Sequence, residues 1–188
     1  IGDQLNANGK ASAADVTEAG MDLYFGDGVP RMADDGLYVI GLAADEKQFN
    51  YHYAQLVLGD IYWKGQGMKA DKPTGLAWYR KAAGNGNIIA LSNLVQYLTV
   101  GVGTPKDLGE AAQWADALEA RLWQTPSPVM GTAASSPPGE AFAGDEQRST
   151  AAMLVAAVSM IAEHDRARGL YWMDRAGRWG CRECAEVM

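Results

Sequence analysis

Cysteine and histidine are scarce in this chain of 188 residues, which contains only Cys181, Cys184, His52 and His164. A structural zinc site normally takes four ligands, and these scattered residues do not form a ligand set, so no metal site and no cofactor are predicted. The Cys181–Cys184 pair also lacks the βαβ surroundings of a redox motif. The open interpretations are free or locally paired structural cysteines, a redox or metal role, and a fragment of a longer array.

Long apolar runs and basic charge are lacking as well. The most apolar segment, 151–162, is much shorter than the 18 or so residues of a membrane-spanning helix, so membrane insertion is not expected. The net charge is −7, and residues 1–50 carry nine acidic side chains against three basic ones. Nucleic acid requires a basic stripe and is not expected, whereas a protein with a basic surface would suit the acidic segment. A solvated, solubilising face would explain the same charge.

Recognisable catalytic arrangements are also missing. No Ser-His-Asp pattern, phosphate-binding loop or set of metal ligands stands out. The pair His164–Asp165 could be drawn as an acid and a base, but Asp165 occupies a position where an aspartate recurs, which favours a helix cap. His52 lies in an aromatic segment, 49–53, which favours packing. No catalytic residue is therefore predicted, and the chain is not expected to be an enzyme.

The chain does repeat itself, with a period in the high thirties. Residues 54–86 match earlier residues when shifted back by 39 positions, and later residues when shifted forward by 36 or by 94. Tryptophan, for example, recurs at Trp78, Trp114 and Trp172. A period of this length indicates an array of units that are too small to bury a core alone. Stacked arrays usually present extended binding surfaces.

The clearest unit, residues 51–87, is predicted to be helix, loop, helix, loop. Gly65 and Gly67 end the first helix, because glycine reaches the left-handed conformation of a C-cap, and Asp71 caps the second helix. Gly59 is expected where a neighbouring helix comes close, because glycine inside a helix costs about 1 kcal/mol relative to alanine. The apolar faces are Ala54, Leu58, Ile61 and Tyr62 on the first helix, and Leu76, Tyr79, Ala82 and Ala83 on the second.

This unit resembles the Sel-one-like repeat, an α/α unit related to the tetratricopeptide repeat. The residues that carry the resemblance are Gly65-x-Gly67, Asp71, Trp78-Tyr79 and Ala82-Ala83. Weaker copies cover most of the chain, and the first has Met32 where the aspartate is expected. The resemblance implies an all-α fold, a right-handed α/α solenoid of about four helix pairs.

The expected organisation is a leader and a single solenoid with one long loop. The loop contains four prolines among Gly, Ala and Ser, and either a functional segment or a tolerated surface insertion explains it. The ranges are 1–12 for the leader, 13–188 for the solenoid with units at 13–50, 51–87, 88–122 and 146–184, and 124–144 for the loop.

The resemblance also implies a function: a non-catalytic scaffold for protein–protein interaction, acting as an adaptor, regulatory or immunity protein, in many relatives bacterial and periplasmic or exported. A cytoplasmic location stays open. Two alternatives also stay open, a hydrolase of cell-wall or β-lactam chemistry and a structural spacer in a larger assembly. In such solenoids the first helices of the pairs line the concave face, where exposed aromatic rings anchor a partner, while Trp78, Trp114 and Trp172 belong to the core. The expected partner-binding residues are Tyr24, Asp60, Trp63, Lys64 and Gln96.

Overall fold

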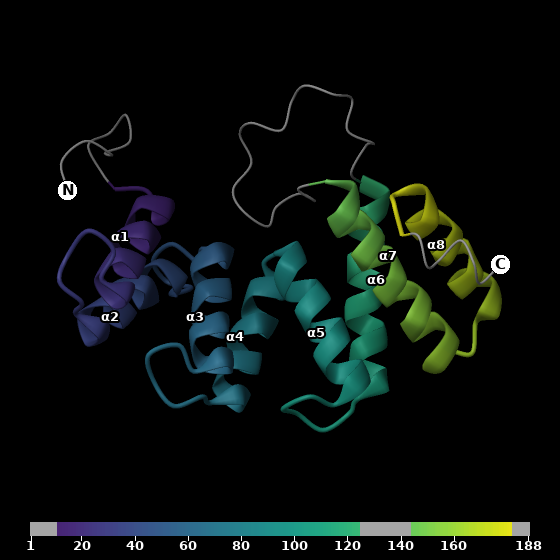
Figure 1. The fold of residues 1–188 in the computed structure, drawn as a ribbon, viewed down its shortest axis with the longest axis horizontal. Helices are drawn as coiled ribbons and strands as arrows, with labels where there is room; N and C mark the ends of the chain where they lie inside the picture. The colour runs from purple at the N-terminus through teal and green to yellow at the C-terminus, as the bar shows by residue number, and fades with distance from the viewer. Residues whose placement is uncertain (1–10, 125–143, 182–188) are drawn as a thin grey trace. The chain divides into compact units, whose positions relative to one another are not determined.

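The computed structural model describes residues 11–124 and 144–181, which form eight α-helices and no strand (Figure 1). The all-α prediction is confirmed. The expected leader and the Pro/Gly/Ser/Ala-rich loop lie outside the described residues except at their edges, as does Cys184. The helices are α1 (Ala13–Phe25), α2 (Ala33–Ala44), α3 (His52–Lys64), α4 (Lys72–Gly84), α5 (Ile88–Val100), α6 (Leu108–Gln124), α7 (Asp145–Ile161) and α8 (Arg166–Arg178).

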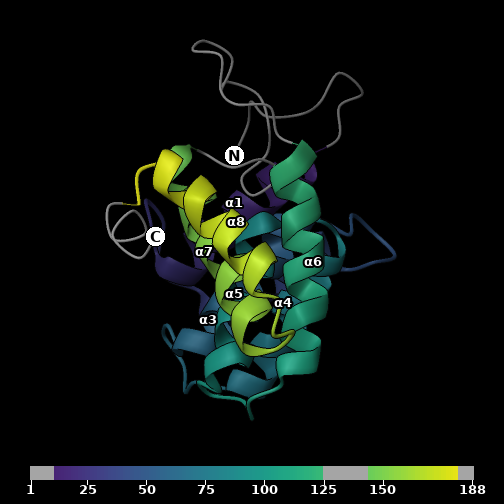
Figure 2. The same ribbon diagram turned by 90° about the vertical axis from the view of Figure 1, so that its right-hand side faces the viewer.

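The helices pack within two compact units, Ile1–Asn87 and Ile88–Met188. In the first unit α1 packs on α2, α3 packs on α4, and α2 and α3 join the two pairs. In the second unit α5 packs on α6 and α7 on α8, and α7 also contacts both α5 and α6 (Figure 2). None of the described helices combines the length and apolar character needed to cross a membrane.

Glycine sets the distance between the helices of the first two pairs. A Cβ added to Gly36 would lie 2.5 Å from the backbone nitrogen of Tyr24, and one added to Gly75 would lie 2.8 Å from that of Trp63. A Cβ on Gly59 would lie 2.6 Å from the ring of Tyr79. The expectation that Gly59 permits a close helix approach is confirmed.

The helix ends follow local rules. Gly65 adopts a left-handed conformation with φ 67° after α3, and the side chain of Asp71 accepts a hydrogen bond from the Thr74 N–H at the start of α4. Hydrogen bonds from the Thr74 hydroxyl and N–H lower the pKa of Asp71. Asp165 caps α8 in the same way, whereas Met32 provides no side-chain cap to α2. The predicted caps at Asp71 and Asp165 are confirmed.

The apolar faces predicted for the second repeat form its core. All four predicted residues of α4 are buried, and in α3 only Tyr62 is partly exposed. One hydrophobic cluster of the first unit joins α1, α2 and α3, and its buried residues are Tyr24, Ile40, Ala43, Ala44, Ala54, Val57, Leu58 and Ile61.

The expectation that all three register-matched tryptophans are core residues is only partly right. Trp172 is 0% exposed, but Trp78 and Trp114 are half-buried. Lys81 lies over the ring of Trp78, 4.7 Å from the ring centroid, and Trp114 donates a hydrogen bond from Nε1 to Glu110. Both rings therefore lie at the edge of the core, each with a charged neighbour.

Candidate functional site

Tyr24 lies inside the contact between the first two repeats, which corrects the expectation of an exposed ring. Its side chain is 1% exposed, and its hydroxyl donates to the carbonyl of Gln66 in the loop after α3. Arg31 reinforces this contact, because its Nε donates to the Tyr24 carbonyl at 3.1 Å and its Nη2 to the Gly67 carbonyl at 3.3 Å. Burial raises the pKa of Tyr24, and the charge of Arg31 opposes part of that rise. The Gly65-x-Gly67 loop thus ends a helix and also joins two repeats.

Trp63 is also buried, at 7% exposure, and does not present its ring as a surface anchor. The ring packs 5.9 Å from that of Tyr79, and the ammonium group of Lys72 lies 5.5 Å from its centroid. The start of α4 covers Trp63 because Gly75 lets the two backbones come together. Partner binding by Trp63 and Tyr24 stays a prediction.

Asp60 and Lys64 do lie at the surface of the first unit. The Lys64 ammonium group is 2.7 Å from a carboxylate oxygen of Asp60, one helical turn away. The other oxygen of Asp60 accepts a hydrogen bond from the Tyr79 hydroxyl at 2.6 Å. The structure therefore places Asp60 and Lys64 in one polar group with the Tyr79 hydroxyl.

Gln96, the last residue of the predicted set, lies on α5 in the second unit and is exposed. Ile89 and Asn93 precede it by seven and three positions, so the three side chains share one face of the helix. Ile89 and Asn93 line a pocket of about 370 Å³. Gln96 therefore lies on the same face of α5 as two residues that line this pocket.

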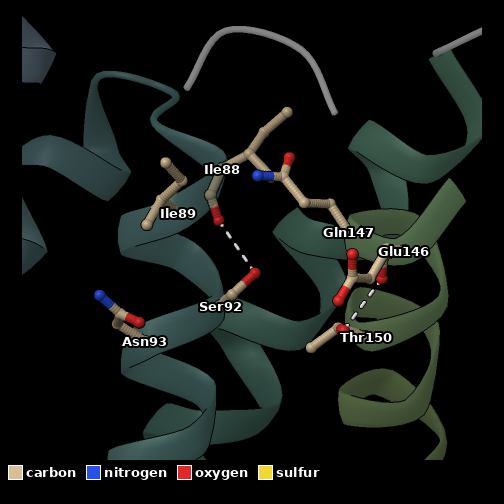
Figure 3. A pocket seen from close by; sticks show the side chains of 7 residues that line it. All are labelled: Ile88, Ile89, Ser92, Asn93, Glu146, Gln147 and Thr150. Carbon is tan, nitrogen blue, oxygen red and sulfur yellow. Dashed lines mark hydrogen bonds between the residues drawn. The ribbon is translucent and has the colours of Figure 1, made fainter. Parts of the chain in front are cut away.

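The pocket lies between the first turns of α5 and α7 (Figure 3). The side chains of Glu146 and Gln147 extend from α7 toward α5. The hydroxyl of Ser92 donates to the Ile88 carbonyl, and that of Thr150 to the Glu146 carbonyl, both at 3.0 Å. The lining residues are Ile88, Ile89, Ser92, Asn93, Glu146, Gln147 and Thr150.

The chemistry of the pocket combines an apolar wall with one carboxylate. Ile88 and Ile89 supply the apolar surface, and Glu146 forms no ion pair with another described residue. A long basic side chain matches this arrangement, because its methylene stem packs on apolar surface while its charged end reaches a carboxylate. The two walls of the pocket are distant in the sequence, so no local sequence pattern predicts it.

A second polar group, centred on Arg168, fastens α8 to α6. Arg168 contacts Asp116 at 2.6 Å, Glu163 at 2.7 Å and Glu119 through both Nε and Nη2. Burial alone would lower the pKa of Arg168, but the hydrogen bonds and charges of the carboxylates outweigh it and raise that pKa. Because Arg168 stays charged and pairs with three carboxylates, its role is to hold α8 against α6.

His52 and Cys181, also considered as candidates for chemistry, have structural roles. His52 is buried, and its Nδ1 lies 3.0 Å from the side-chain nitrogen of Asn87. Cys181 is disulfide-bonded, which is one of the alternatives left open for the cysteines. Among the residues that the structure describes, no group of three or more His, Cys, Asp or Glu side chains could hold a metal ion.

Comparisons with known proteins agree with the repeat seen in the sequence. The family model of the Sel1 repeat matches residues 52–87, 90–116 and 160–178. A Sel1 repeat protein from Oxalobacter formigenes is similar in structure, with 28% sequence identity and a TM-score of 0.50 over 58% of this chain and 80% of that chain. Among curated proteins, none matches the sequence.

A second solved structure shows the fold alone. It is a protective antigen present in uropathogenic Escherichia coli strains and displays the SLR fold, with 17% identity and a TM-score of 0.50 over 92% of this chain. The match spans 39% of the antigen's length. The fold is therefore that of an all-α helical-repeat solenoid.

Proposed function

We propose that this chain is a Sel1 repeat protein, a helical-repeat scaffold that binds other proteins, and that it acts without catalysis as an adaptor, regulatory or immunity protein. One observation carries the proposal. The pocket between α5 and α7 combines an apolar wall with the carboxylate of Glu146, which has no ion pair within the described part of the chain.

The pocket would receive a lysine or arginine side chain of the partner. The side-chain stem would pack on Ile88 and Ile89, and its charged end would reach Glu146, a charge-assisted contact. Ser92 and Thr150 donate their hydroxyl protons to helix carbonyls, so neither hydroxyl is hydrogen-bonded to a side chain that could activate it as a nucleophile. This chemistry supports binding.

From the pocket, the partner would continue along the exposed face of α5. Asn93 and Gln96 supply amide groups on that face, and Val100, 66% exposed, extends it by one turn. A partner with a basic surface also suits the acidic first repeat, which would accelerate its approach by electrostatic attraction. In the first unit, Asp60 and Lys64, with the Tyr79 hydroxyl on Asp60, would offer a separate polar contact.

The test is a selection of peptides on the immobilised protein from a displayed random library, followed by calorimetry. Selected peptides should be enriched in lysine or arginine, and Glu146→Gln should raise their dissociation constant about tenfold, equivalent to about 1.4 kcal/mol. Glu18→Gln, which removes the same charge from α1, is the matched control and should change the affinity less than twofold. Peptides without basic residues, or equal affinities for the two variants, would reject the pocket as the binding site.

The native partner tests the wider surface. After affinity capture from the source and purification of the captured protein, Gln96→Ala and Asn93→Ala should each weaken its binding. Gln113→Ala, an exposed amide change on α6, should not. If only the Asp60 and Lys64 variants lose binding, the site belongs to the first unit instead.

A further inference from the structure

Three aromatic rings and one arginine meet where the end of α6 lies against α8. Trp123 stacks on Tyr171 with ring centroids 5.8 Å apart, and both rings contact the fully buried Trp172. The guanidinium carbon of Arg175 lies 4.8 Å from the ring centroid of Trp123 and 5.2 Å from that of Tyr171. Trp123 is 55% exposed and Tyr171 40% exposed. A large part of this cluster therefore faces solvent.

Arg175 differs from the two neighbouring arginines of α8 that have carboxylate partners. Arg168 contacts three carboxylates, and Arg178 pairs with Asp174 at 2.8 Å. Arg175 has aromatic rings and no carboxylate partner among the described residues. Its charge is held in place by cation–π contacts and remains available to an external carboxylate.

We propose that Trp123, Tyr171 and Arg175, here called the aromatic–arginine patch, form a docking surface for the acidic end of a second copy of this chain. Tryptophan, tyrosine and arginine are the residue types that most often dominate binding energy at protein interfaces. The stacked rings are fixed by their contacts with Trp172, so little conformational freedom is lost on binding.

The acidic end is the turn between α1 and α2, and it offers the complementary chemistry. The N–H of Met32 donates to the Leu23 carbonyl at 2.8 Å and closes the turn. Phe25 and Met32 are exposed there, at 45% and 49%. The carboxylates of this end form no ion pair with any described residue; they belong to Asp22, Asp27, Asp34 and Asp35. Carboxylates beside exposed apolar groups match a guanidinium beside exposed rings.

Exposed aromatic rings with arginine can also stack on single-stranded nucleic acid. The apolar side chains of the acidic end favour a protein segment, because the exposed Phe25 and Met32 can cover the rings while neighbouring carboxylates reach Arg175. An acidic protein end brings fewer charges and includes apolar side chains that can cover the rings.

The contact joins two different surfaces, so it is heterologous and each copy can dock onto the next. The test is sedimentation velocity of the purified chain in 150 mM salt. Concentrations up to about 1 mM are used so that even a weak contact, with a dissociation constant of about 1 mM, is detected. The wild-type protein should show reversible, concentration-dependent association. Arg175→Glu and the double variant Asp34→Lys/Asp35→Lys should each weaken the association more than tenfold.

A mixture of the two variants provides the decisive measurement. The Arg175→Glu chain keeps its acidic end and the double variant keeps its patch, so the mixture should form a one-to-one dimer although each variant alone is monomeric. Arg166→Glu reverses an exposed charge at the other end of α8 and is the matched control, expected to associate as wild type. Glu146→Gln should also associate as wild type, which separates this inference from the proposed function.

Three results would overturn the inference. The wild-type chain could remain monomeric throughout the concentration range. Each charge variant could self-associate as strongly as the wild type does, which would place the contact elsewhere. An oligouridine probe could bind the wild-type chain and fail to bind the Trp123→Ala and Arg175→Glu variants, which would make the patch a nucleic-acid surface.

Discussion

The two units use different means to hold their helix pairs together. In the first unit both pairs cross at glycines, as shown by Gly75, whose added Cβ would lie 3.0 Å from the Gly59 carbonyl. The same register positions in the third repeat carry Val95 and Ala111, both buried. The difference shows that the repeat period and the distance between helices are separate properties. The period fixes which positions face the neighbouring helix, and the side chains at those positions fix the separation.

The fourth pair illustrates an intermediate case. Gly169 has the same register as Gly75, but an added Cβ would first meet the side chain of Met160, at 2.5 Å. A flexible methionine side chain can move, whereas a backbone cannot without shifting a helix. The two glycines thus occupy equivalent positions under different constraints.

The last helices of the two units, α4 and α8, show a similar contrast. Trp78 with Lys81 and Trp172 with Arg175 are equivalent pairs, in which a cation lies over an indole three residues earlier. Trp78 is half-buried, whereas Trp172 is fully buried because Trp123 adds a further ring above it. One motif therefore forms an edge contact in one unit and the base of an aromatic cluster in the other.

The largest effect is expected from tryptophan truncation, which tests this contrast directly. Trp172→Ala should reduce the free energy of unfolding by about 3–5 kcal/mol, because it removes a fully buried ring. Trp78→Ala should cost less than half as much, since its ring is partly solvated already. Urea denaturation followed by far-ultraviolet circular dichroism measures both. Equal losses would mean that register, and not local burial, sets the contribution.

A smaller effect is expected at the helix crossings. Gly75→Ala should destabilise the protein by about 2–3 kcal/mol, because the new methyl group meets backbone. Gly169→Ala should cost less than about 1 kcal/mol, because Met160 can move aside. Gly41→Ala, with no neighbour within 4 Å, is the control and should stabilise the protein by about 0.5–1 kcal/mol through helix propensity. Equal costs at Gly75 and Gly169 would contradict the distinction between backbone and side-chain neighbours.

The smallest effect concerns the uncapped helix of the first repeat. Met32→Asp should stabilise α2 by about 1 kcal/mol at pH 7, because it adds the side-chain cap that α4 and α8 have. A capping aspartate has a lowered pKa in the folded state, as Asp71 does, so the gain should be present above the unfolded pKa of about 3.9 and disappear as the pH falls below it. Thermal unfolding at pH 7 and pH 2.5 measures the effect. A gain that persists at pH 2.5 would assign it to helix propensity.

Local interactions were predictable from the sequence. The caps at Asp71 and Asp165, the left-handed glycine after α3 and the apolar faces of the second repeat depend on residues a few positions apart. The repeat also predicted the helix pairs, and the resemblance it carries agrees with the Sel1 repeat model, which matches three segments of the chain. Such features follow from hydrogen bonds and side-chain periodicity within one helix, so one unit of sequence is enough to identify them.

The depth of burial and the candidate sites were decided only by the tertiary structure. Register placed Trp63 next to the core face and Trp78 in it, yet the close approach of α4 covers Trp63 and leaves Trp78 at the edge. The pocket between α5 and α7 and the aromatic–arginine patch join helices from different repeats. Sequence periodicity determines which side of a helix is apolar, but exposure depends on which other side chains come to lie above it, and that is fixed only when distant helices pack.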